Sequence, residues 1–370
     1  HVSLGSRPWA LHESGAAPGF SYLQYNLTNP AAWEHGFGML GILPLLALAI
    51  AGGRAWGDGA HLVFLRDVEM HLRLLVALPL LLAAELTVHR WTRDGISQLL
   101  GQSIIPEHEQ ARFRRAVDSA MALRNSLPME IALLATVYVV GIGYVWNVHL
   151  KLEVDSWYGL ASSGGFSLTP AGWWAVLVSL PLFQFILVRW FYRVFIWGRL
   201  LFQISRLDLS YLPAHPDRCG GIGFLANISL GFAPIMLAVS TLLSGVIADR
   251  VFYQGGSLTA FTVEIVGIVL LMLACILGPL FFFSPGMARA KHAGQLHYSQ
   301  LANTYVRAFN HKWLGSPFPP EGDLLGNADF QSLADVSSAV EVVNSMRLAP
   351  FTLASLVQLV VITLLPLAPL

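Results

Sequence analysis

Long apolar segments recur along the chain, and charged segments separate them. Each apolar segment is close to the roughly 20 residues that a helix needs to cross a bilayer. Six of them cover residues 36–53, 72–88, 128–148, 222–247, 261–283 and 350–366, and the remaining one, fourth along the chain, starts at Gly172. The pattern therefore predicts an all-α, polytopic membrane protein with about seven transmembrane helices.

Proline recurs inside these apolar segments. In water, a proline within a helix removes a backbone hydrogen bond and costs about 3 kcal/mol. In a bilayer, neighbouring helices, hydroxyl groups and buried water can satisfy the freed carbonyls. The prolines in question are Pro44, Pro79, Pro181, Pro234 and Pro279. Their recurrence agrees with membrane helices, and it predicts bends that open polar crevices in the bundle.

The fourth segment does not end at the expected membrane edge. Aromatic and basic residues follow one another from Arg189 to Arg193 and recur at Trp197, which is typical of a membrane interface. The helical pattern then continues to about Leu207. With a rise of about 1.5 Å per residue, this helix is expected to project well beyond the lipid headgroups.

The positions of the arginines predict the orientation, because cytoplasmic loops carry an excess of Lys and Arg. Basic residues gather in the connections that follow the second, fourth and sixth segments. These connections are therefore expected in the cytoplasm, together with the N-terminus. Arg54, Arg66 and Arg73 fall on the predicted outer side. If the first segment does not cross fully, the N-terminus lies outside instead.

The same pattern divides the chain into six regions. They are an N-terminal tail (1–35), transmembrane helices one and two (36–88), a cytoplasmic helical segment (89–127), transmembrane helices three to six with a cytoplasmic extension and turn at 189–221 (128–283), a second cytoplasmic helical segment (284–348) and transmembrane helix seven (349–370). In the second cytoplasmic segment, side chains at steps of three and four predict one buried helical face. They are Tyr298, Leu301, Tyr305, Phe309 and Trp313.

Composition narrows the possible classes of protein. Hydrophobic residues make up 55% of the chain and charged residues 12%, against about 25% charged in soluble domains. The formal net charge is zero, so no overall field attracts nucleic acid. Two cysteines, Cys219 and Cys275, are too few for a four-cysteine zinc site. Because no motif of a hydrolase, nucleotide or metal site is present, no catalytic residue, metal or cofactor is expected.

A polar turn from Pro213 to Gly221 precedes the fifth segment. It could hold an anion such as a lipid phosphate, because paired glycines let backbone amides converge and a helix N-terminus follows. The candidate residues for this site are His215, Arg218, Gly220 and Gly221. Two alternatives stay open. Asp217 can cap the following helix, and a metal site that includes Cys219 is only weakly indicated by the spacing.

Ionisable residues embedded in a membrane are the usual indication of function, so their depth matters. Glu85 lies near the cytoplasmic end of the second segment, and Arg189 and Arg193 lie at a comparable depth on the fourth. We expect Glu85 to pair with one of these arginines and lock the two helices together; a gate or a proton site is the alternative. No charged residue or histidine falls at the centre of a segment, which disfavours simple proton antiport.

Mild polarity inside the apolar segments provides the candidates for a pore lining. Thr352, Ser355 and Gln358 form a polar stripe on the seventh segment, and Gln184 lies inside the fourth. Such side chains can instead hold helices together or satisfy carbonyls at proline breaks. In the pore interpretation, the path is shared between several copies of the chain.

Three short runs resemble motifs of an uncharacterised group of bacterial multi-pass membrane proteins. The first begins at Arg206, the second continues from His215 to Leu225, and the third extends from Asp329 to Asp335. The resemblance covers roughly the second half of the chain. It implies a bacterial inner (plasma) membrane, and it assigns no activity and no functional residue.

The function predicted from these features is an oligomeric channel or passive transport pore for ions or small solutes. Membrane lipids and further copies of the same chain are the expected partners, and nucleic acid is not. One alternative is a membrane enzyme or lipid-handling protein that uses the turn from His215 to Gly221. A further alternative is a sensor or assembly subunit whose cytoplasmic helices bind a partner.

Overall fold

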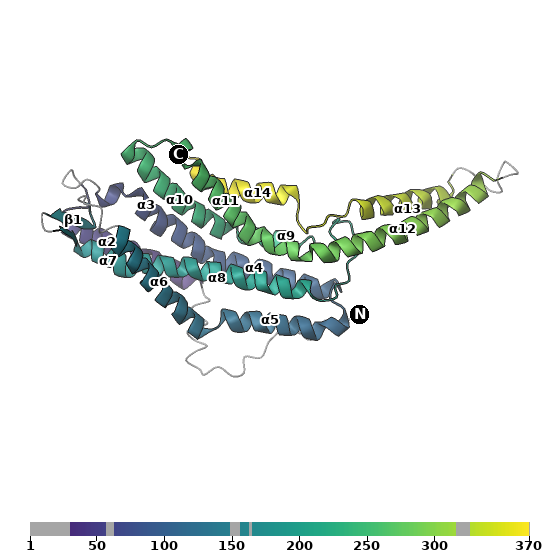
Figure 1. The fold of residues 1–370 in the computed structure, drawn as a ribbon, viewed down its shortest axis with the longest axis horizontal. Helices are drawn as coiled ribbons and strands as arrows, with labels where there is room; N and C mark the ends of the chain where they lie inside the picture. The colour runs from purple at the N-terminus through teal and green to yellow at the C-terminus, as the bar shows by residue number, and fades with distance from the viewer. Residues whose placement is uncertain (1–29, 57–62, 149–155, 163–164, 316–325, 370) are drawn as a thin grey trace.

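The computed structural model describes residues 30–56, 63–148, 156–162, 165–315 and 326–369. Most of the predicted N-terminal tail lies outside these residues. Within them the chain is nearly all-α (Figure 1). The helices of the first half are α2 (Pro30–Ala51), α3 (Val68–His71), α4 (Leu78–Gly101), α5 (Gln110–Arg124), α6 (Leu127–Val148), α7 (Pro170–Trp174) and α8 (Leu180–Ser205).

The second half of the chain continues in the same way. Its helices are α9 (Leu225–Leu230), α10 (Ala233–Gln254), α11 (Thr262–Leu277), α12 (Ser284–Trp313), α13 (Ala328–Asn344) and α14 (Leu353–Leu364). Tighter or wider helical turns join or extend these helices. They are η1 (Phe64–Arg66), η2 (Leu72–Ala77), η3 (Glu107–Glu109), η4 (Ala175–Ser179), η5 (Leu258–Phe261), η6 (Gly278–Phe283) and η7 (Leu365–Leu367).

Four continuous helical stretches are long and apolar enough to cross a membrane. They are Val68–Gly101, Pro170–Ser205, Leu225–Phe252 and Leu258–Trp313. Helices α5 and α6, bent by 45° relative to each other, add a fifth if they are counted as one broken span. The first and last predicted segments coincide with shorter apolar helical stretches, Gly41–Ala51 and Leu353–Leu367. By length and composition, this is a helical membrane protein.

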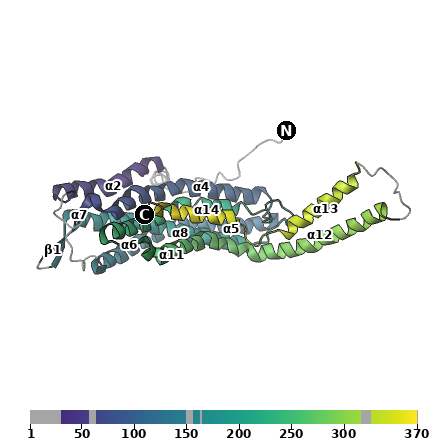
Figure 2. The same cartoon turned by 90° about the horizontal axis from the view of Figure 1, so that it is seen from above.

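The bundle is elongated, and its two ends differ (Figures 1 and 2). At one end lies a short antiparallel hairpin of β1 (Gly159–Ser162) and β2 (Gly165–Leu168), in which Gly159 is opposite Leu168. The all-α prediction missed this hairpin, because its strands are too short for a clear alternating pattern. At the other end, α12 and α13 form a helical hairpin that extends away from the rest (Figure 2).

The prolines lie mainly at junctions between helical elements. Pro79 and Pro181 are the second residues of α4 and α8, and each follows a π-helical turn, η2 or η4. A wider turn removes the clash between the proline ring and the carbonyl four residues earlier. Pro234 is the second residue of α10, and Pro279 lies in the 3₁₀ turn η6. Only Pro44 among the five lies inside a regular α-helix.

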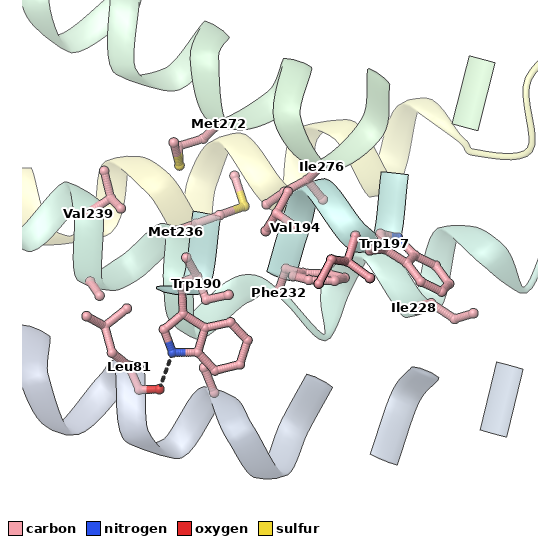
Figure 3. Packing of buried hydrophobic residues seen from close by; sticks show 14 of the residues in the cluster. Leu81, Trp190, Val194, Trp197, Ile228, Phe232, Met236, Val239, Met272 and Ile276 are labelled. Atoms are coloured by element: carbon pink, nitrogen blue, oxygen red, sulfur yellow. Dashed lines mark hydrogen bonds between the residues drawn. The ribbon is translucent and has the colours of Figure 1, made fainter. Parts of the chain in front are cut away.

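The core lies where α4, α8, α10 and α11 pack together (Figure 3). Trp190 is buried there, and its indole N–H donates to the carbonyl of Leu81 at 2.8 Å. Gly95 of α4 lets Ile228 approach closely, since a Cβ at this position would lie 2.0 Å from its Cδ1. A larger residue at position 95 would therefore force the buried Ile228 side chain to move.

Hydroxyl groups hold several of the helices together. Ser179 donates to the carbonyl of Gly41 at 2.9 Å. Ser240 and Ser244 of α10 donate to the carbonyls of Thr363 and Pro366, which ties the C-terminal helix to the bundle. These contacts agree with the alternative to a pore lining, in which hydroxyl groups inside the apolar segments hold helices together.

The hairpin of α12 and α13 buries a narrower face than the sequence pattern predicts. The indole N–H of Trp313 donates to the Asp329 carboxylate at 3.0 Å, and the ring of Phe309 packs edge-on against Phe330 at 5.0 Å. Leu301, however, is 54% exposed. The prediction of a buried Leu301 is wrong, because a helix that packs on a single partner buries only the side chains along their line of contact.

Candidate ligand site between α4, α5 and α8

A cavity of about 260 Å³ lies between α4, α5 and α8. It is slightly smaller than the 300–1,000 Å³ that is common for pockets of drug-sized ligands. Its lining residues are Glu85, Val88, His89, Thr92, Arg93, Ile96, Val117, Ala120, Met121, Arg124, Trp190, Arg193, Ile196, Trp197, Leu200 and Phe232. The cavity lies where the apolar first halves of α4 and α8 give way to their more charged second halves.

Three charged side chains from three helices form one edge of the cavity. The Glu85 carboxylate of α4 accepts a hydrogen bond from Arg193 of α8 through Oε2. Its Oε1 accepts from Nη2 of Arg124 of α5 at 3.3 Å. The side chains are largely buried, with Arg193 14%, Glu85 23% and Arg124 29% exposed. Two cations therefore share a single carboxylate, which leaves one positive charge in excess.

A second ion pair lies beside the first. Arg189 of α8 pairs with Glu130 of α6, with 3.0 Å between Nη2 and Oε1. The sequence predicts that Glu85 pairs with Arg189 or Arg193. The structure forms the pair with Arg193, and it gives Arg189 a different partner on α6.

The break between α5 and α6 places Arg124 and Glu130 at adjoining helix ends. Arg124 is the last residue of α5 and Glu130 lies in the first turn of α6, so each charge suits the dipole of its own helix. Pro128, the second residue of α6, cannot donate the hydrogen bond that would continue α5. The amides of Met129 and Glu130 instead bond to the carbonyl of Ser126 and start a new helix.

Polar contacts continue along α8 in both directions from these pairs. Toward the β-hairpin end, Gln184 packs against Gly141 of α6, where a Cβ would lie 2.6 Å from its Oε1. Toward the other end, Arg199 donates to Oγ of Ser119 at 3.1 Å. We call Gln184, Arg189, Arg193 and Arg199 the α8 polar row. Gln184, Arg189 and Arg199 contact α6 or α5, whereas Arg193 contacts Glu85 of α4.

His89, Thr92 and Arg93 also line the cavity, and the rest of its wall is apolar and aromatic. Figure 3 shows three of the aromatic side chains, Trp190, Trp197 and Phe232. Trp190 supports the charged edge, because the Arg193 guanidinium lies 4.8 Å from the centroid of its ring. Trp197, one helical turn beyond Arg193, packs against Phe232 and is only 6% exposed. Among the described residues, no acceptor bonds to its indole N–H. A buried indole usually has such an acceptor.

Sequence reasoning missed Arg124 and gave no role to Glu130. By sequence alone Arg124 falls in the cytoplasmic segment 89–127, and Glu130 is an acid near the start of the third apolar segment. A signal for both was present in the sequence, since Pro128 between them indicates a helix break. The break brings both side chains to α8, far from them in sequence.

The four pore-lining candidates do not come together in one chain. Thr352 caps α14 by accepting a hydrogen bond from the Ser355 amide at 2.9 Å, and the two hydroxyl oxygens lie 2.9 Å apart. Gln358 is exposed on α14, which packs on α10 and α11. Gln184 lies at the contact of α6 and α8 instead. Gln358 thus faces outward, whereas Thr352 and Ser355 are half-buried at the start of α14, and none of the three belongs to the α8 polar row.

In the turn from His215 to Gly221, the backbone amides bond to the carboxylate of Asp217, a residue of the turn itself. Asp217 accepts hydrogen bonds from the amides of Cys219, Gly223 and Gly221 at 2.7, 2.9 and 3.2 Å. The Nδ1 atom of His215 lies 2.9 Å from its Oδ1. Burial alone would raise the pKa of Asp217, but these hydrogen bonds outweigh burial and lower the pKa. The amide of Gly221 proposed for an external anion is therefore already bonded within the chain.

Glycine permits the shape of this turn, and neighbouring elements hold it in place. Gly220 and Gly221 have φ angles of +68° and +90°, which side chains disfavour. The exposed Arg218 also has a positive φ, and its carbonyl accepts a hydrogen bond from the Arg347 amide at 2.7 Å. The turn thus joins the start of the α9 segment to the end of α13.

The described residues contain no group of three or more His, Cys, Asp or Glu side chains placed to hold a metal ion. In comparisons with known proteins, no family model, no curated protein and no solved structure matches this chain. The resemblance to bacterial multi-pass membrane proteins therefore stays a prediction. The function has to be inferred from the geometry of the site.

Proposed function

We propose that this chain is a passive membrane transport protein whose solute path uses the α4–α5–α8 cavity and the α8 polar row. One observation carries the proposal: the chain bends by 45° between α5 and the apolar helix α6, and paired ionisable residues from α4, α5, α6 and α8 meet at the bend. Broken helices with ionisable residues at the break form the binding sites of many transporters.

The ion pairs supply a physical means of gating. Glu85 holds α4, α5 and α8 together through Arg193 and Arg124, and Arg189 holds α8 to α6 through Glu130. A solute that offers its own charge to these arginines would compete with the glutamates and loosen the contacts between the helices. Since the centres of the apolar segments carry no charged residue and no histidine, the proposed transport is passive rather than proton-coupled.

We further propose seven membrane crossings, with a cytoplasmic N-terminus, in a bacterial inner membrane. The shorter apolar stretches at residues 41–51 and 353–367 complete the seven. The arrangement supports this orientation, because α5 and the α12–α13 hairpin, which carry many of the basic residues, lie toward the same end of the bundle (Figure 1). Together they would form the predicted cytoplasmic layer.

Assembly of several copies is supported by the outer face of α14. Gln358 is exposed there between Leu353, Val357 and Val361, which are 77, 49 and 56% exposed. An amide that faces lipid lacks hydrogen-bond partners, whereas an amide at a helix–helix contact finds them in the neighbouring helix. We therefore propose that α14 faces a second copy of the chain and that the protein is a homo-oligomer.

Reconstitution into liposomes tests the proposed transport. Purified protein should accelerate the release of small entrapped ions or solutes, and Glu85→Gln or Arg193→Gln should change the rate several-fold. Arg307→Gln, an exposed arginine on α12 far from the cavity, is the matched control. If protein-containing and protein-free liposomes leak equally with anionic, cationic and neutral solutes, at several pH values and voltages, the proposal is wrong.

A further inference from the structure

We infer that the α4–α5–α8 cavity binds an amphipathic anion, with its acid group on Arg124 and Arg193 and its apolar body between the three helices. The inference rests on the proposed function in one respect only, namely that the bound anion is also the solute that is transported. The binding site itself follows from charge, shape and an unbonded donor at the cavity.

Charge balance indicates an anionic group. Arg124 and Arg193 share Glu85, and each guanidinium keeps further N–H donors beyond the one that contacts this carboxylate. A largely buried positive charge without a full counter-charge is unfavourable. A carboxylate or phosphate placed between the two arginines would supply that charge and accept directed hydrogen bonds from both side chains.

The walls of the cavity indicate that the anion carries an apolar body. Beyond the charged edge, the lining is dominated by Ile96, Val117, Trp197, Leu200 and Phe232. An inorganic ion would bind at the arginines and leave this surface uncovered. A chain or ring attached to the acid group would cover it and remove apolar area from water.

Trp197 adds a requirement for the body of the ligand. Its buried indole N–H has no acceptor among the described residues, and its ring lines the cavity. Trp197 lies four residues after Arg193 on α8, so the two side chains project on the same side, about 6 Å apart along the helix. An ester or ketone oxygen on the ligand, one helical turn from the acid group, would accept this hydrogen bond.

A lysophosphatidate satisfies these requirements, because it combines a phosphate, an ester oxygen and an apolar chain. A soluble medium-chain carboxylate offers the same head and body without the ester. The shared chemistry is an amphipathic anion, and it could come from the membrane or from the cytoplasm. The two sources are separated by testing both compounds.

The test uses the full chain in nanodiscs of uncharged lipid and measures binding by calorimetry. Four compounds are compared: lysophosphatidate, octanoate, inorganic phosphate and an uncharged monoacylglycerol. We expect lysophosphatidate and octanoate to bind at a single site. Inorganic phosphate and the monoacylglycerol should bind at least tenfold more weakly, because the former lacks the apolar body and the latter lacks the acid group. Tighter binding of lysophosphatidate than of octanoate would assign the ligand to the membrane, and the reverse order would assign it to the cytoplasm.

Variants locate the site within the chain. Arg193→Gln and Arg124→Gln should each weaken binding of the anions by roughly tenfold or more, as loss of a charge-assisted hydrogen bond predicts. Arg206→Gln, an exposed arginine just beyond α8 and outside the cavity, should leave binding unchanged. Trp197→Phe should weaken lysophosphatidate more than octanoate, since only the former offers the ester oxygen.

Loss of an arginine could also disturb folding. A further variant therefore keeps both arginines and fills the cavity with a larger side chain. Ala120→Phe places a ring in the cavity, and it should abolish binding while size-exclusion behaviour is retained. The inference is overturned if both amphipathic anions fail to bind, or if they bind equally well to Arg193→Gln, Arg124→Gln and Ala120→Phe. Binding without any flux would contradict the transport proposal alone, and flux without binding would contradict only the ligand inference.

Discussion

Arg189 and Glu130 form an ion pair, with 3.0 Å between Nη2 and Oε1, that joins the middle of α8 to the first turn of α6. One helical turn further along α8, Arg193 pairs with Glu85 of α4. The two adjacent arginines therefore connect α8 to different helices. A change in either pair alters how α8 is held against the broken helix, which makes these pairs the first targets for mutation.

Removal of the shared carboxylate should destabilise the bundle. In Glu85→Gln, Arg124 and Arg193 face each other without a counter-charge. We expect stability to fall by about 2–4 kcal/mol, somewhat below the full cost of breaking a completely buried pair. Thermal unfolding in detergent measures this, with Glu107→Gln on the exposed surface as the control. An unchanged melting temperature in Glu85→Gln would show that the two arginines do not depend on this carboxylate.

The pair of Arg189 and Glu130 should tolerate exchange of its charges. Arg189→Glu or Glu130→Arg alone places two like charges together, and either variant should lower the melting temperature. The double variant restores opposite charges and should recover part of the loss, with a coupling energy of roughly 0.5–3 kcal/mol. Additive effects in the double-mutant cycle would contradict direct pairing.

The turn around Asp217 should respond to acidification. Hydrogen bonds lower the pKa of Asp217 in the folded chain below its ordinary value of 3.8, so its carboxylate favours folding when it is ionised. This contribution is fully present above the unfolded pKa, and it is lost as the pH falls through the folded pKa. In Asp217→Asn the contribution should be absent at every pH, at a cost of about 1–2 kcal/mol.

Hydrogen exchange at the amides of Cys219, Gly221 and Gly223 measures this effect directly. These amides should exchange faster in Asp217→Asn than in the native chain at neutral pH, because each loses its carboxylate acceptor. Asp208→Asn, in the exposed part of the same connection, is the matched control. Equal protection in all three proteins would show that Asp217 does not hold the turn.

The proposed contact between α14 helices can be tested by cross-linking. In membranes, Gln358→Cys should form a disulfide-linked dimer under mild oxidation, because two copies of the exposed face would meet there. Val263→Cys on α11 is 81% exposed in the native chain and serves as the control. If both variants cross-link to the same low extent, α14 is not the contact.

Apolar patterning made the helices predictable, and it did so for a local reason. Each expected segment is helical over most of its length, since a stretch of about 20 apolar residues in a bilayer must satisfy its own backbone. The pattern could not show that η2 and η4 precede Pro79 and Pro181. Such turns depend on how the proline ring fits against neighbouring helices.

The candidate site was only partly predictable. Glu85 and Arg193 were recognisable because charged residues in apolar helices need partners. Arg124 was not, because its role depends on the bend between α5 and α6, which turns it toward Glu85 across 39 residues of sequence. For Gln358, only the packing of α14 shows that its side chain faces outward.

The amino-acid sequence by itself determined that this chain is a helical membrane protein, where its apolar helices lie and which side chains carry charge near their ends. These properties follow from hydropathy and helical periodicity, which act over short stretches of chain. The tertiary structure alone decided that two arginines share Glu85 at the edge of a cavity and that Asp217 occupies the amides of its own turn. Both arrangements depend on distances between residues far apart in sequence, which only the packing of the helices sets.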